Sequence, residues 1–313
     1  MSKQGENKHW AAQQERGTLF FLTLTRWLVK YCPLWLIRFV TFWVVGYFYL
    51  TSRKVRGYIA EYQRNLQATF PQVRLKKGAI FRQFLAFGEA ITDRFAVWQQ
   101  QIHYDDLIHD DPDDVYGAID GGGRGQILVC SHFGNIEICR ALSNSGHHPN
   151  FKLNALVHSK HAEAFNQALE QAGAAAMPII QVEQLDVAKM LELSECIERG
   201  EWIAIAADRI PVRGDKTQAV NFLGKSAEFP EGAWFLASLL KTKINTIFCV
   251  KEQGRYRFKL RHFSDGINGR GTQRQQNIQQ AMQDYADLLA RECAENPYQW
   301  FNFYDFWQQK NGD

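Results

Sequence analysis

Residues 126–137 read QILVCSHFGNIE, and their pattern indicates the fold class. Ile127–Cys130 is a short apolar run of the length of a buried strand, and residues 135–142 have the pattern of a helix. Between them, residues 131–134 form a short turn that contains a glycine. A strand, a turn and a helix in this order make up the unit from which parallel α/β sheets are built.

The same alternation continues toward the C-terminus and predicts a mixed, mainly parallel central sheet flanked by helices. The predicted strands are residues 153–157, 176–182, 202–207, 244–250 and 256–260, and the predicted helices are 161–172, 185–199, 231–240 and 275–294. Residues 229–232, which read FPEG, are expected to begin a helix without an apolar strand before them. Upstream, residues 61–100 are expected to be helical and 105–114 to be an acidic, turn-rich stretch.

Residues 18–51 are dominated by Leu, Phe, Trp, Val and Tyr and form the predicted anchor. Their second half, residues 34–50, approaches the roughly 20 apolar residues that a membrane-spanning helix needs. Arg53, Lys54 and Arg56 follow, so the positive-inside rule would place the rest of the chain in the cytoplasm. The alternative is a helical hairpin buried in a soluble core. We expect membrane attachment, spanning or interfacial, because apolar residues surround the helix.

Length and composition limit the remaining possibilities. A chain of 313 residues can bury one large core, and we divide it into residues 1–56, a tail with the anchor, and 57–313, the α/β domain. A net charge of +3 without any long basic run argues against nucleic acid as a partner. The six cysteines lack metal-ligand spacing and fit a reducing, cytosolic location, and His147 and His148 are expected to be solvated.

His132 and Glu137, five positions apart, are the residues best suited to chemistry. An imidazole takes up a proton near neutral pH, as a base must when a hydroxyl or an amine attacks an acyl group. A carboxylate behind the ring fixes its tautomer, and Glu137 is placed to turn back toward it. Because a capped loop histidine beside a glutamate is also common, the spacing alone leaves both interpretations open.

The segment SHFGNIE, residues 131–137, resembles the H-x4-D/E motif of the lysophospholipid acyltransferase superfamily. Its form is similar to that of the bacterial lipid A late acyltransferases. Other segments follow in the order of that family: the apolar N-terminus, Asp208-Arg209 leading to residues 220–224, and the sequence PYQWF at residues 297–301. The resemblance therefore spans nearly the whole chain.

This resemblance implies transfer of a fatty acyl chain from an acyl thioester, typically on acyl carrier protein, to a lipid or glycolipid acceptor. The acceptor would present a hydroxyl or an amine at the cytoplasmic face of the bacterial inner membrane. By carry-over, His132 is the base and Glu137 its partner. Asn135 is also expected to bind substrate. Asp208 and Arg209 follow a predicted strand and are expected to bind substrate there, with Arg209 holding the phosphate of a phosphopantetheine arm or of an acceptor; the alternative is a surface ion pair. No metal or tightly bound cofactor is implied. The chain lacks a G-x-S-x-G sequence, which favours direct attack by the acceptor over an acyl-serine intermediate.

Residues 302–307 depart from the lipid A enzymes, because they read NFYDFW where a basic pair usually follows the Gln-Trp segment. An acidic residue is a poor partner for a phosphorylated sugar. This ending is more similar to a branch of the family found near aryl polyene pigment and glycolipid genes. Two rival functions stay open: a lipid hydrolase that uses the same residues with water, and a non-catalytic membrane scaffold in a lipid-assembly complex.

Overall fold

The computed structural model describes residues 31–98, 101–139, 145–157, 179–181, 186–210 and 216–307. The predicted helix at residues 161–172 and the first part of the predicted anchor, residues 18–30, lie outside the described residues.

A seven-stranded sheet forms the centre of the molecule, with strand order β1-β9-β8-β2-β5-β3-β4. The strands are β1 Ile108–Asp110, β2 Ile127–Cys130, β3 Leu153–Val157, β4 Ile179–Gln181, β5 Trp202–Ala206, β8 Ile244–Glu252 and β9 Arg255–Ser264. β8 and β9 pair antiparallel, and the other neighbours pair parallel. The prediction of a mixed, mainly parallel sheet is therefore confirmed.

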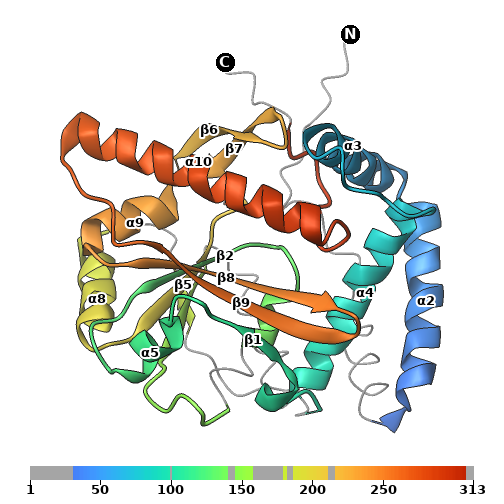
Figure 1. The fold of residues 1–313 in the computed structure, drawn as a ribbon, viewed down its shortest axis with the longest axis horizontal. Coiled ribbons are helices and arrows are strands. Elements are labelled where there is room, and N and C mark those ends of the chain that lie inside the picture. Colours follow the sequence, from blue (N-terminus) through green and yellow to red (C-terminus); the bar gives the residue numbers. More distant parts are fainter. Residues whose placement is uncertain are drawn as a thin grey trace.

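Helices cover both faces of this sheet (Figure 1). They are α2 Leu34–Thr51, α3 Arg53–Thr69, α4 Ala79–Trp98, α5 Val115–Asp120, α8 Val187–Glu198, α9 Gly232–Leu240 and α10 Gly271–Glu295, with short 3-10 turns η2 Tyr104–Asp106 and η3 Ile136–Ile138. Alternate residues of β2 point to opposite faces, as strand geometry requires. Ile127 and Val129 join the core under α8, α9 and α10, whereas Leu128 and Cys130 join the core with α5 and the end of α4.

Several elements differ from the sequence-based expectations. The stretch predicted as one helical region is divided into α3 and α4 by a loop that begins near Pro71, because proline disfavours helical conformation in the residue before it. The acidic stretch contains the edge strand β1. A hairpin of β6 Thr217–Phe222 and β7 Lys225–Pro230 forms a separate two-stranded sheet. The expectation of no strand before residues 229–232 is therefore wrong, although α9 does begin at Gly232.

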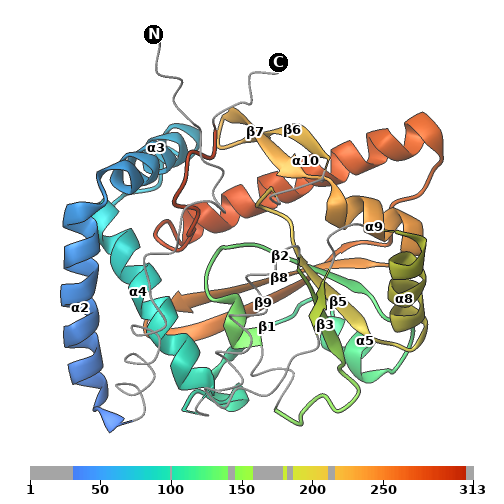
Figure 2. The same cartoon turned by 180° about the vertical axis from the view of Figure 1, so that it is seen from behind.

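α2 packs by one side on α4, which lies between α2 and the sheet (Figures 1 and 2). Among the described helices, none has by itself the length and apolar composition of a membrane span. α2 and α3 meet that test only as a pair, Trp35–Thr51 with Arg53–Thr69, bent by 93°. The proposed division at residue 56 falls inside α3, so it does not coincide with the end of a helix.

Candidate active site

His132 and Asp208 meet because two neighbouring parallel strands end together. Cys130 of β2 lies opposite Ala206 of β5, and each strand delivers one of the two side chains two residues later. His132 Nδ1 lies 2.8 Å from Asp208 Oδ1, and the backbone N–H of His132 donates to Asp208 Oδ2 at 3.0 Å. Both residues thus lie beyond the carboxyl ends of parallel strands, where ligands of such sheets usually bind.

Asn302 and Arg209 support Asp208 from its other side. Asp208 is fully buried, and Asn302 Nδ2 donates to its Oδ2 at 2.8 Å. Arg209 in turn donates from Nε to Asn302 Oδ1 at 2.5 Å and from a terminal amino group to the carbonyl of Phe301 at 2.9 Å. The carboxylate therefore accepts hydrogen bonds from both sides, as a buried charge requires.

The C-terminal segment brings Asn302 into place by pairing with the motif. The backbone N–H of Gly134 donates to the carbonyl of Gln299 at 2.8 Å, and that of Phe301 donates to the carbonyl of His132 at 2.9 Å. Asn302 was not predicted as a site residue. The signal that could have identified it is its position directly after the aromatic segment 297–301, which carries part of the family resemblance.

Gly134 is required by the backbone at this crossing. Its φ is +69°, a region that residues with a side chain rarely adopt. A Cβ atom there would lie 2.0 Å from the carbonyl oxygen of Cys249, which accepts the backbone N–H of Asn135 at 2.8 Å. A glycine is therefore required at this turn after His132.

Asn135, which the sequence analysis predicts to bind substrate, has a side chain directed into the protein. It is only 1% exposed. Its Nδ2 donates to the carbonyl of Ala90 at 3.0 Å and contacts the Tyr256 hydroxyl at 3.4 Å, while its Oδ1 accepts from Arg94 Nε at 3.2 Å. The amide thus ties the motif to α4 and orients an arginine beside it.

Glu137 lies in η3, one turn after the motif histidine, and is partly exposed. Among the described residues, no hydrogen bond joins Glu137 to His132, whose Nδ1 is instead bonded to Asp208. The assignment of Glu137 as the orienting carboxylate therefore stays a prediction from the sequence. The helix predicted at residues 135–142 begins as this 3-10 turn, and residues 140–144 lie outside the described residues.

The surroundings of His132 favour its neutral form. Burial lowers the pKa of the imidazole, and the positive charges of Arg209 and Arg94 lower it further, which outweighs the opposite effect of Asp208. Burial by itself would raise the pKa of Asp208, but the interaction with His132 and the charge of Arg209 bring it below its ordinary value. The side chain of His132 nevertheless stays 35% exposed, so part of it is open to solvent.

His148 differs from the expectation of a solvated histidine. Its side chain is buried, with Nδ1 2.8 Å from Asp120 and Nε2 2.9 Å from the Tyr104 hydroxyl. The expectation is wrong because chain folding brings a carboxylate that sequence spacing did not reveal. In the part of the chain that the structure describes, no group of three or more His, Cys, Asp or Glu side chains is arranged to hold a metal ion.

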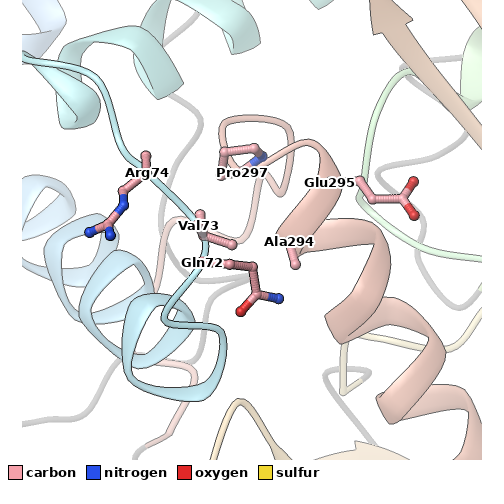
Figure 3. Close-up of a pocket in the computed structure, with 6 residues that line it drawn as sticks. All are labelled: Gln72, Val73, Arg74, Ala294, Glu295 and Pro297. Atoms are coloured by element: carbon pink, nitrogen blue, oxygen red, sulfur yellow. The ribbon is translucent and has the colours of Figure 1, made fainter.

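A hollow of about 400 Å³ opens elsewhere, between the segment after α3 and the C-terminal end of α10 (Figure 3). It is lined by Gln72, Val73, Arg74, Ala294, Glu295 and Pro297. None of the residues around His132 lines it, and in Figure 3 the carboxylate of Glu295 points away from the other lining side chains. This hollow is therefore separate from the candidate active site at His132.

Comparison with known proteins assigns the chain to a family. The model of the bacterial lipid A biosynthesis acyltransferases matches residues 6–309, a range that includes His132, Asp208 and Asn302. No curated protein shows a significant match. The family match covers nearly all of the 313 residues. The chain therefore belongs to the bacterial lipid A biosynthesis acyltransferase family.

Proposed function

We propose that this protein transfers a fatty acyl chain from an acyl thioester, carried by acyl carrier protein, to a hydroxyl or an amine of a lipid or glycolipid. The family membership supports an acyltransferase that acts on a lipid. The observation that carries the proposal is the 2.8 Å contact between His132 Nδ1 and the buried Asp208, on an imidazole that stays partly exposed.

His132 acts as the general base in this reaction. With its Nδ1–H donated to Asp208, the ring keeps the lone pair of Nε2 for a proton from the acceptor. As that proton leaves, the acceptor oxygen or nitrogen bonds to the thioester carbonyl carbon. The carbon–sulfur bond then breaks, and the imidazolium returns the proton to the departing thiolate. The lowered pKa of His132 suits this role, because it keeps the base unprotonated near neutral pH.

We assign the orienting role to Asp208, because it holds both the ring and the backbone N–H of His132. Glu137 stays a candidate from the sequence motif and is tested beside it below. Ser131 is buried, with its Oγ out of contact with solvent. This burial supports direct attack by the acceptor and argues against a serine nucleophile.

The outer side of α2 supports attachment to the inner membrane, with the catalytic part of the chain in the cytoplasm. This aromatic stripe consists of Trp35, Phe39, Trp43, Tyr47 and Leu50, which are 56–71% exposed. Their spacing places them along one side of the helix, while the opposite side packs on α4. Trp and Tyr are enriched where membranes meet water. Arg53 and Lys54, also exposed, follow directly and suit anionic headgroups.

The acceptor we propose is a lipid or glycolipid other than lipid A, as in the branch near aryl polyene and glycolipid genes. Residues 302–307 follow the Gln-Trp segment, after which the lipid A enzymes usually carry a basic pair, and the side chain of Asn302 is buried and bonded to Asp208 and Arg209. It is therefore engaged inside the protein and cannot pair with a phosphorylated sugar. Asp305, three residues later, is acidic and is a poor partner for a phosphorylated sugar.

The test is acyl transfer by the full chain in detergent, with acyl carrier protein loaded with fatty acids and a total lipid extract from the host. Mass spectrometry should reveal an acylated lipid whose formation is abolished by His132→Ala, with folding confirmed by circular dichroism. Release of free fatty acid without an acylated lipid would favour the hydrolase. Undiminished transfer by His132→Ala would exclude this residue as the base, and no turnover with any acceptor would favour the scaffold.

A further inference from the structure

Arg94 is a partly buried cation directly beside the motif. It lies in the last part of α4, and its Nε donates to Oδ1 of Asn135 at 3.2 Å, three residues after His132. Its charge acts on the imidazole, because it is one of the groups that lower the pKa of His132. Arg94 lies outside the motif and outside the segments that carry the family resemblance.

Arg94 has no carboxylate partner within the described ranges, in contrast to two other partly buried arginines, whereas the partly buried Arg56 donates to the backbone carbonyls of Tyr49 and Leu50. Arg257 pairs with Glu252 at 2.9 Å, and Arg261 pairs with Asp110 at 2.7 Å. Within the described ranges, no carboxylate lies within ion-pair distance of Arg94, and its only hydrogen bond uses Nε. Charged groups removed from water are normally paired. The two terminal amino groups of Arg94 are therefore suited to an anion that is not part of the described protein.

The neighbouring acid on α4 is held away from Arg94 by other partners. Asp93 accepts hydrogen bonds from Lys251 Nζ at 2.7 Å and from the Tyr256 hydroxyl at 2.6 Å. The same Tyr256 hydroxyl lies 3.4 Å from Nδ2 of the buried Asn135. These contacts hold the Asn135 amide, and through it the guanidinium, in a defined position. The arrangement leaves a preorganised positive group beside the base.

We propose that Arg94 binds a phosphate group of one of the two substrates of acyl transfer. The proposal rests on the proposed function, because both sources are substrates of that reaction. One source is the phosphate of the 4′-phosphopantetheine arm that carries the acyl thioester. The other is a phosphate in the headgroup of the lipid acceptor. A guanidinium suits either one, since its paired N–H groups match the geometry of phosphate oxygens.

The experiment measures binding of small phosphate probes to the full chain in detergent by isothermal titration calorimetry. Pantetheine 4′-phosphate is compared with pantetheine for the donor, and short-chain phosphatidic acid with short-chain diacylglycerol for the acceptor. The variants are Arg94→Gln and Arg94→Lys. Arg82→Ala is the matched control, because Arg82 lies on the same helix, is exposed and contacts only the Lys77 carbonyl among the described residues.

We expect one phosphorylated probe to bind the wild type more tightly than its phosphate-free counterpart. Arg94→Gln should lower the binding affinity for that probe by about tenfold or more, which is the effect of losing one hydrogen bond to a charged group. Arg94→Lys should restore part of the affinity, and Arg82→Ala should change nothing. The probe whose affinity depends on Arg94 identifies whether the bound phosphate belongs to the donor or to the acceptor. Equal affinity of wild type and a folded Arg94→Gln for both phosphorylated probes would overturn the proposal.

His132→Ala separates this inference from the proposed function. The variant should lose acyl transfer yet bind the phosphorylated probe as the wild type does, because Arg94 is held by Asn135 and not by His132. If His132→Ala keeps its transfer activity while the probe still depends on Arg94, the proposed role of the base fails and the phosphate site stands.

Discussion

Asp208→Asn tests the central feature of the site, because three donors converge on this one carboxylate. Oδ1 faces His132 Nδ1 at 2.8 Å, and Oδ2 accepts from the backbone N–H of His132 at 3.0 Å and from Asn302 Nδ2 at 2.8 Å. An asparagine replaces one oxygen by an NH2 group. In the position of Oδ2, the NH2 group would face two N–H donors, the backbone of His132 and Asn302 Nδ2. In the position of Oδ1, it would face only the His132 ring. We therefore expect the amide nitrogen to face His132.

An imidazole that accepts this bond at Nδ1 must carry its proton on Nε2, where the acceptor's proton has to be received. The wrong tautomer and the loss of the buried negative charge together should lower kcat by about 10³–10⁴-fold, as in other enzymes with an Asp-oriented histidine. This corresponds to about 4–5.5 kcal/mol in activation free energy. The free energy of unfolding should fall by only about 1–3 kcal/mol, because a neutral hydrogen bond replaces a charged one.

The assay follows formation of the acylated lipid at saturating thioester, beside urea unfolding of the same protein. Glu137→Gln is the matched variant, since it makes the same chemical change in the other candidate carboxylate. If Asp208 orients the ring, Asp208→Asn should lose more activity than Glu137→Gln. A folded Asp208→Asn within tenfold of the wild type, with an inactive Glu137→Gln, would refute the reasoning and restore the motif glutamate as the orienting residue.

Three further changes test other parts of the structure. Gly134→Ala should destabilise the fold by more than about 2 kcal/mol in urea unfolding, because the new Cβ would meet the Cys249 carbonyl at 2.0 Å and φ is positive; a wild-type midpoint would contradict this. A base must be unprotonated, so kcat/KM should fall as pH decreases through the pKa of His132, with its midpoint below 6.5. Arg94→Gln should raise that midpoint, because it removes a positive charge that lowers the pKa of His132. An unchanged midpoint in a pH–rate series would argue against the influence of Arg94. Trp43→Lys in the aromatic stripe should reduce the membrane-bound fraction in cell fractionation without unfolding the protein, whereas undiminished binding would exclude this stripe as the contact.

Local pattern predicted much of the sheet. The strands β2 and β3 begin and end where their apolar runs do, because both are buried strands bounded by polar or turn residues. Short or partly exposed strands were missed. β1 lies in an acidic stretch, and β6 and β7 form a hairpin with several exposed positions, so none of them carries a long apolar run.

Sequence alone determined that His132 stands at the end of a buried strand and that Gly134 is needed just after it, since both depend on neighbouring residues. Only the tertiary structure decided what surrounds the imidazole. Asp208 reaches it because β5 lies beside β2, Asn302 because the C-terminal segment pairs with the motif, and Arg94 because α4 packs against it. These partners are remote in the chain, and hydrophobic periodicity carries information about the burial of each segment but not about which segments become neighbours.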